Sequence, residues 1–241
     1  LFGIFKEEIC GGITMVQLYV LDIRTLPDPA EHPEILEFIG DQRKEKVMKY
    51  RQADGRKRSL GAGILLGEIL QRFGVSPGKI RIREGGKPEA DGIFFNLSHS
   101  GELVICAVGD KEVGCDVEKI AKAPKRIAER FFHPGEKAYL KACGEERQNG
   151  EFYRLWTMKE SYIKMTGEGM RLSLDRIEFV LGTEKVRVRR DGELISCHIR
   201  EYDVPGYKIS VCSWEEDFVD YIEFAKSRYN GCLLSKEGSL W

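Results

Sequence analysis

Long apolar runs are missing from this sequence, and their absence argues against a membrane-spanning or secreted protein. No stretch approaches the roughly 20 apolar residues that a membrane-spanning helix needs. Within residues 1–12, Lys6, Glu7 and Glu8 interrupt the apolar run that a signal peptide requires. We therefore expect a cytoplasmic protein that does not bind membranes. The first residue is Leu1 and not methionine, so the true N-terminus stays open.

Paired cysteine motifs and an excess of charge are also missing. The seven cysteines are scattered without a C-x-x-C pair, so we expect them to be reduced and mostly buried. The 38 Lys and Arg residues nearly balance the 39 Asp and Glu residues, which gives a formal net charge of -1. This balance argues against a protein that binds nucleic acid over its whole surface, although it allows local basic patches.

The order of predicted elements indicates an α+β protein made of two similar halves. A strand over 15–23, helices over 34–50 and 55–73, and strands over 79–83, 93–97 and 103–108 form the first half. A strand over 113–118 is followed by helices over 126–132, from 134 and over 152–165. Strands over 176–181, 186–190, 193–201, 207–213 and 218–224 complete the second half. We divide the chain into halves 1–112 and 113–224 and a tail 225–241, and expect a ligand site where the halves meet.

An acidic cluster is the strongest candidate site. Asp116 and Glu118 are two residues apart in a predicted strand and share one face, opposite the apolar Val113, Cys115 and Val117. In the helix over 152–165, Glu160 and Lys164 are four residues apart and also share a face. Taken separately, each pair is more often an ordinary solvated surface. Together, the three carboxylates predict a site for a hard cation such as magnesium, which commonly acts with phosphates.

Three weaker signals are compatible with phosphate binding. The polar end of a strand, Ser98-His99-Ser100, can hydrogen-bond a phosphate or form a simple polar turn; no G-x-S-x-G motif supports a serine hydrolase. The Gly85-Gly86-Lys87-Pro88 segment lacks P-loop spacing and indicates a hairpin turn. A basic run can be a solvated helix face or a phosphate patch; it comprises Arg43, Lys44, Lys46, Lys49, Arg51, Arg56, Lys57 and Arg58.

The motifs occur in an order that resembles the Sfp-type 4′-phosphopantetheinyl transferases over roughly residues 15 to 215. The series is Arg58-Ser-Leu, Gly86-Lys87-Pro88, Asn96-Leu-Ser98-His99-Ser100-Gly101, Gly114-Cys-Asp116-Val-Glu118 and Trp156-Thr-Met-Lys159-Glu160-Ser-Tyr-Ile-Lys164. The last two motifs are the specific ones. The resemblance implies two α+β halves related by a pseudo-twofold axis, with coenzyme A and Mg²⁺, or Mn²⁺, in the cleft between them.

The resemblance also implies roles for individual residues. Asp116, Glu118 and Glu160 would hold the metal against the diphosphate of coenzyme A, and Lys164 would reach that diphosphate. Arg58, helped by His99, would contact the 3′-phosphate. The nucleotide would be lined by Gly86, Lys87, Pro88, Ser98 and Ser100, with Arg43 and Lys46 as upstream basic contacts.

The implied reaction transfers the 4′-phosphopantetheine arm to a serine of an apo acyl or peptidyl carrier protein and releases 3′,5′-ADP. Glu160 would be the general base. Arg130, Phe131 and Phe132 resemble the region that docks the carrier, although we expect at least one phenylalanine to be a core residue. The expected protein is monomeric. The alternatives are a non-catalytic module that binds coenzyme A or carriers, and a nucleic-acid binder built on the basic run, which lacks interleaved aromatic residues.

Overall fold

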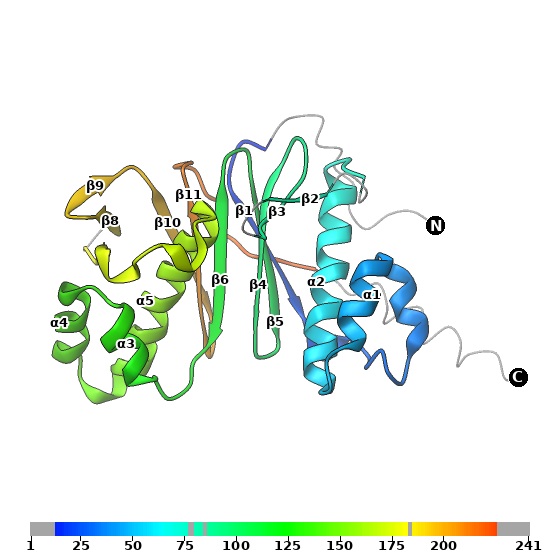
Figure 1. Ribbon diagram of the computed structural model, residues 1–241, viewed down its shortest axis with the longest axis horizontal. Helices are drawn as coiled ribbons and strands as arrows, with labels where there is room; N and C mark the ends of the chain where they lie inside the picture. The colour runs from blue at the N-terminus through cyan, green and yellow to red at the C-terminus, as the bar shows by residue number, and fades with distance from the viewer. Residues whose placement is uncertain (1–12, 77–79, 84–85, 183–184, 226–241) are drawn as a thin grey trace, which may run out of the picture.

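Two long helices, each packed on its own antiparallel strands, organise the chain (Figure 1). The computed structural model describes residues 13–76, 80–83, 86–182 and 185–225. Within these residues, no helix is both long and apolar enough to cross a bilayer.

The N-terminal half places the helix α2 against a four-stranded sheet. Its strands have the order β12-β1-β5-β4. Leu60, Ile64 and Leu65 of α2 are buried against apolar residues of β1 and β5, as their helical spacing predicts. The elements of this half are β1 (Gln17–Asp22), α1 (Asp41–Met48), α2 (Ala53–Arg72), β2 (Arg81–Ile82), β3 (Pro88–Glu89), β4 (Phe94–Ser100), β5 (Leu103–Gly109) and the 3₁₀ turns Ile23–Thr25 and Pro33–Phe38.

The single helix predicted over 34–50 is wrong. A 3₁₀ turn ends at Phe38, and α1 begins only at Asp41. The backbone is extended at Ile39 (φ −129°, ψ 154°) and at Gly40 (φ −67°, ψ 155°), and this breaks the helical hydrogen-bond ladder. Gly40 thereby becomes the N-cap of α1.

The C-terminal half places α5 against a three-stranded sheet of order β10-β11-β6. A second small sheet, β7-β8-β9, lies beyond it. The elements are β6 (Val113–Lys119), α3 (Lys125–Phe131), α4 (Pro134–Ala142), α5 (Glu145–Thr166), β7 (Ile177–Val180), β8 (Arg187–Arg190), β9 (Glu193–Ile195), β10 (His198–Val204), β11 (Tyr207–Ser213), β12 (Glu223–Phe224) and the 3₁₀ turns Gly169–Arg171 and Leu174–Arg176.

Three boundaries in this half differ from the predictions. The helix α5 starts at Glu145 and not at 152, because its first turns are polar and carry no apolar pattern. The strand predicted over 193–201 is divided into β9 and β10, and the one over 218–224 is regular only at Glu223–Phe224. This last strand, β12, pairs in parallel with β1, so the chain returns to the N-terminal sheet after completing the C-terminal one.

The halves share apolar packing as well as a chain connection. One core cluster combines Leu18 and Ile105 from the N-terminal sheet with Val113, Val117 and other residues from the C-terminal strands. The predicted burial of Val113, Cys115 and Val117 is confirmed, since all three are 1% exposed or less. The two halves therefore form one continuous structure, and a site between them has fixed walls.

The cysteines agree with their prediction where the structure describes them. Cys106, Cys115, Cys143, Cys197 and Cys212 are free and buried. Cys10 and Cys232 lie outside the described residues, as does most of the predicted tail over 225–241.

Candidate active site

The strands β4 and β6, one from each half, lie side by side and are joined by side chains. Asn96 Oδ1 accepts a hydrogen bond from the Cys115 backbone N–H at 3.0 Å. Further along, the Ser98 hydroxyl donates to Asp116 Oδ1 at 2.7 Å and the Ser100 hydroxyl donates to Glu118 Oε2 at 2.7 Å. We call this line of contacts between Phe94–Ser100 and Val113–Lys119 the seam.

The helix α5 brings a lysine to the seam. Lys164 Nζ lies 2.6 Å from Asp116 Oδ1 and 2.9 Å from Ser98 Oγ. Glu160 lies one turn earlier on the same helix face. Burial, and then the negative charge of Asp116, raises the pKa of Glu160, so the two carboxylates interact electrostatically. The structure thus brings Asp116, Glu118, Glu160 and Lys164 together from β6 and α5, although Asp116 and Lys164 are 48 residues apart in sequence.

Gly114 makes this closeness possible. A Cβ atom at this position would lie 2.0 Å from the carbonyl oxygen of Ser161 and 2.3 Å from the backbone N of Met165. Both residues belong to the last two turns of α5. The backbone of β6 therefore touches the backbone of α5 at the point where the acidic strand faces the acidic helix, and only glycine fits there.

Negative charge is concentrated at the seam. Burial, followed by the charge of Asp116, raises the pKa of Glu118 above its ordinary value. Burial also disfavours the Lys164 ammonium, but Asp116, Cys115 and Glu160 together outweigh that effect, and the pKa of Lys164 is raised. Asp116 is only 4% exposed, and its Oδ2 atom has no hydrogen-bond partner among the described residues. Such an oxygen favours a cation.

The donor set fits a hard divalent cation. Within the described part of the chain, no group of three or more His, Cys, Asp or Glu side chains is gathered closely enough to hold a metal by itself. Magnesium, however, is usually bound by one or two carboxylates together with waters and substrate phosphates, so a closed protein cage is not required. The buried Asp116 Oδ2, which has no hydrogen-bond partner among the described residues, and the neighbouring Glu118 carboxylate have the chemistry that such an ion requires of its ligands.

Basic residues of the N-terminal half lie on one side of the seam. An Arg58 guanidinium nitrogen donates to the Gly101 carbonyl at 3.1 Å, at the turn that follows β4. Burial, and then the positive charges of Arg58, Lys164 and Lys46, lowers the pKa of His99. These four cationic or ionisable groups therefore converge near one end of β4, and an anion placed there would relieve their repulsion.

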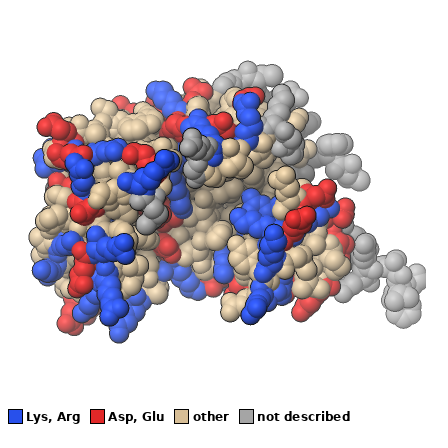
Figure 2. All heavy atoms as spheres, in the orientation of Figure 1, with Lys and Arg blue, Asp and Glu red and all other residues tan. Residues whose placement is uncertain are grey.

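The remaining basic candidates are on α1. Arg43 is half-buried, with its Cγ 3.0 Å from the position of a Cβ on Gly63, so its stem packs against α2. Lys46 is exposed. Figure 2 shows Lys and Arg side chains gathered over α1 and α2 beside the hollow between the two halves.

The predicted hairpin at the glycine-rich segment is confirmed. Arg81 pairs with Glu89 and Ile82 with Pro88, and Gly86 has a positive φ of 88°. The Lys87 ammonium does not extend freely toward the basic residues around His99. It is instead hydrogen-bonded to the carbonyl of Met165, at the end of α5, at 2.9 Å.

A buried ion pair behind the seam was missed by sequence reasoning. Lys159 and Glu136 are 0% and 1% exposed at their side chains and are 2.8 Å apart. Lys159 also donates to the carbonyls of Leu174 and Ile177, at 2.9 and 2.7 Å. The available signal was the position of Lys159 next to Glu160 in the motif. A lysine beside a site residue on a helix is expected to be solvated, so the burial of Lys159 could not be predicted from the sequence.

An aromatic cluster flanks the acidic residues. Phe132 is fully buried, with its ring stacked 5.3 Å from Phe152, which confirms that at least one of the two phenylalanines is a core residue. Phe131 is only partly buried and lies 6.1 Å from Trp156 and under the Arg130 guanidinium at 5.0 Å. The side chain of Trp156 also interacts with Glu118.

The chain is similar to proteins of known class. Residues 112–212 match the family model of the 4′-phosphopantetheinyl transferase superfamily. The chain is 34% identical over 207 residues to the 4′-phosphopantetheinyl transferase Sfp of Bacillus subtilis strain 168, covering 80% of this chain and 89% of that protein. It is 32% identical over 180 residues to the 4′-phosphopantetheinyl transferase gsp of Aneurinibacillus migulanus, covering 73% and 76%. A solved holo-[acyl-carrier-protein] synthase of Thermotoga maritima is 21% identical, covers 44% of this chain and 63% of that one, and has a TM-score of 0.38.

The family model and the relatives together define the class of enzyme as a phosphopantetheinyl transferase. Within that class, the chain belongs to the Sfp-type 4′-phosphopantetheinyl transferase family. Enzymes of this family use coenzyme A as substrate and act on carrier proteins.

Proposed function

We propose that this enzyme transfers the 4′-phosphopantetheine arm of coenzyme A to a serine of an apo acyl or peptidyl carrier protein, in a magnesium-assisted reaction that releases 3′,5′-ADP. The observation that carries the proposal is the seam. There, Asp116 Oδ1 lies 2.6 Å from Lys164 Nζ, while the buried Oδ2 has no hydrogen-bond partner among the described residues. Glu118 and Glu160 lie beside this carboxylate. Carboxylates and a lysine in this arrangement suit a diphosphate bound together with a metal.

Binding of coenzyme A is assigned to both walls of the seam. Arg58, His99, Arg43 and Lys46 supply positive charge for the phosphates of the nucleotide. Burial and then nearby cations lower the pKa of His99, and a bound 3′-phosphate would act in the opposite direction and favour its protonated form. The nucleotide would also contact Ser98, Ser100, Gly86 and Pro88.

The metal ligands in this proposal are Asp116, Glu118 and Glu160, holding Mg²⁺ or Mn²⁺. When bound, the cation neutralises charge on the diphosphate as it develops in the transition state. In this structure the Lys164 ammonium donates a hydrogen bond to Asp116 Oδ1. When the diphosphate is bound, the same ammonium would contact a phosphate oxygen. Before the metal binds, Ser98 orients Asp116, because its hydroxyl donates to the same carboxylate.

The chemical step is a displacement at phosphorus. The serine hydroxyl oxygen of the carrier forms a bond to the phosphorus that bears the pantetheine arm, and the bond from that phosphorus to the bridging oxygen breaks. Glu160 would accept the hydroxyl proton. Burial and the charge of Asp116 raise its pKa when no metal is bound, and a bound cation would lower it again, so its position and not its basicity suits it to this role. Lys164 stabilises the negative charge on the departing 3′,5′-ADP.

The carrier protein would dock beside the aromatic cluster. Arg130 is exposed and Phe131 is partly exposed on α3, whereas the buried Phe132 supports them from the core. A monomer in the cytoplasm completes the proposal.

The test is an incubation of the protein with coenzyme A, Mg²⁺ and an apo carrier domain, followed by mass spectrometry of the carrier. We expect a mass gain of one phosphopantetheine on the wild-type carrier and none on a carrier whose acceptor serine is alanine. Glu160→Gln and Asp116→Ala should abolish transfer in folded protein. Glu146→Gln, the same change at an exposed position of α5, should leave transfer intact. No mass gain on several carriers would contradict the proposed reaction, and full activity of Glu160→Gln would contradict the role of Glu160.

A further inference from the structure

Lys87 contacts three groups that belong to other parts of the fold. Its Nζ atom lies 2.5 Å from Glu112 Oε2, 3.2 Å from the Val113 carbonyl and 2.9 Å from the Met165 carbonyl. The side chain is only 10% exposed. An ammonium group has three donors, and here all three have acceptors. The nucleotide-lining role expected for this side chain would require it to give up contacts that hold it inside the protein.

One end of this network is the C-terminus of α5. The helix ends at Thr166, followed by Gly167 in the left-handed conformation (φ 70°). The last carbonyls of a helix lack intrahelical donors and carry the negative end of the helix dipole, so a cation is stabilised there. Met165 is adjacent to Lys164, the residue that reaches Asp116.

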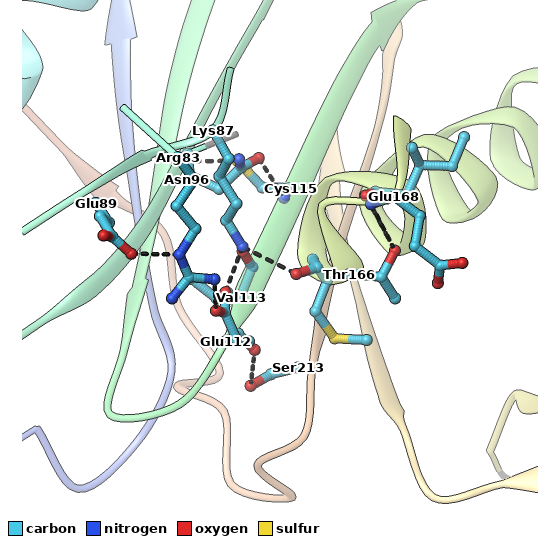
Figure 3. A network of polar contacts seen from close by, with 12 residues as sticks. Arg83, Lys87, Glu89, Asn96, Glu112, Val113, Cys115, Thr166, Glu168 and Ser213 are labelled. Carbon is cyan, nitrogen blue, oxygen red and sulfur yellow. Dashed lines mark hydrogen bonds and ion pairs between the residues drawn. The ribbon is translucent and has the colours of Figure 1, made fainter. Parts of the chain in front are cut away.

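The other end is the turn that leads into β6. Glu112 pairs with Arg83 as well as with Lys87, and its carbonyl accepts a hydrogen bond from the Ser213 hydroxyl at 3.1 Å. Figure 3 shows the Lys87 side chain extending from the hairpin between the start of β6 and the end of α5. Burial would raise the pKa of Glu112, but its pairing with Lys87 and Arg83 outweighs this and lowers it.

We infer that Lys87 is a positioning residue that ties the hairpin and the start of β6 to the end of α5 and thereby holds Lys164 and Glu160 in register with Asp116. The hairpin, the start of β6 and the end of α5 are far apart in sequence and meet at the Lys87 ammonium. The last two segments carry the acidic residues of the seam. The kinetic consequences rest on the proposed function, whereas the structural tie does not. A tie of this kind affects the rate of the chemical step, because that step depends on the relative placement of the two walls.

The experiment compares Lys87→Met with Glu112→Gln, the double variant, and Lys111→Met as a control that removes an exposed lysine next to Glu112. We expect Lys87→Met to lower the melting temperature by several degrees and Lys111→Met to leave it unchanged. The Lys87 and Glu112 effects on stability should not add, because each variant breaks the same contact. Glu112→Gln is the milder change. If Lys87→Met folds poorly, the melting temperature and kcat of Glu112→Gln still test the contact between Lys87 and Glu112.

Two further readouts separate positioning from nucleotide binding. For Lys87→Met, we expect kcat to fall at least tenfold while Kd for 3′,5′-ADP, measured by calorimetry, stays within twofold of the wild type. A tenfold weaker Kd with an unchanged melting temperature would overturn the inference and assign Lys87 to the nucleotide. Additive stability effects of Lys87 and Glu112 would overturn it too. If the wild-type protein transfers nothing to any carrier, the proposed function fails, while the melting temperatures still decide whether Lys87 is the tie.

Discussion

Replacing Gly114 with alanine perturbs the active site without changing any charged or hydrogen-bonding side chain. The added Cβ would lie 2.0 Å from the Ser161 carbonyl oxygen, whereas ordinary contacts begin at 3.4 Å. The atoms that crowd it are backbone atoms of α5, which cannot rotate away as a side chain would. The helix and the strand must therefore separate by about 1.4 Å, the difference between these two distances.

That separation is large compared with the contacts it affects. Lys164 Nζ is 2.6 Å from Asp116 Oδ1, and a shift of this size in the helix would break the hydrogen bond unless the lysine stem follows. Misplacement of reacting groups by about 1 Å can cost about 100-fold in rate, so we expect kcat to fall by about this factor. Overpacking a well-filled interior also costs about 1–3 kcal/mol in the free energy of unfolding.

The assay measures transfer to an apo carrier under saturating coenzyme A, alongside urea unfolding of the same protein. Gly150→Ala is the matched control, since Gly150 is in the same helix and its Cβ would meet only the end of Lys208, at 4.0 Å. This control should keep wild-type kcat and lose no stability. Wild-type kcat in Gly114→Ala, at unchanged stability, would refute the argument that the approach of α5 to β6 sets the geometry of the site.

Three further predictions follow from other contacts. Lys159→Met leaves the Glu136 carboxylate buried without its partner and should cost about 3–5 kcal/mol in urea unfolding; a loss below 1 kcal/mol would contradict the burial of the pair. Arg56 holds the pKa of Asp28 at about 2, below its ordinary 3.8. The resulting stabilisation is present above pH 3.8 and is lost as the pH falls through about 2. Arg56→Gln should therefore lower the free energy of unfolding at pH 6 and lower it less at pH 3; an equal loss at both pH values would argue against this ion pair. Chelation by EDTA should abolish transfer, and added Mg²⁺ should restore it; transfer that persists in EDTA would contradict a metal-assisted reaction.

Parts of the fold with a strict periodicity could be predicted from the sequence. In β6, alternation places Val113, Cys115 and Val117 on the buried face and the carboxylates of Asp116 and Glu118 on the other. The apolar spacing in α2 likewise predicts its buried face. The start of α5 could not be predicted because its first turns carry no apolar pattern. The break at Gly40 could not be predicted because Ile35, Leu36 and Ile39 continue a helical spacing up to it, and local backbone conformation decides there.

The close approach of the two halves could not be read from the sequence either. The motif that contains Gly114 marks this glycine as part of the candidate site. It does not reveal that the glycine packs against the backbone of α5. Similarly, Lys159 looks like a solvated neighbour of Glu160, whereas tertiary packing buries it with Glu136 and two backbone carbonyls. Both features depend on which elements pack together, and periodicity within one element carries no information about its partner.

The serines of β4 illustrate why residue type alone leaves a role open. Ser98 and Ser100 were expected to contact the nucleotide, and their hydroxyls instead donate to Asp116 and Glu118 across the seam. A hydroxyl can donate one hydrogen bond and accept two, so a serine that holds a carboxylate retains acceptor capacity but has no second proton for a phosphate. Ser98 and Ser100 can therefore contact a phosphate through their hydroxyls only if they release the carboxylates, which a metal bound to Asp116 and Glu118 would permit. In the proposed mechanism, metal binding and nucleotide binding at the seam would therefore be coupled through the same two protons.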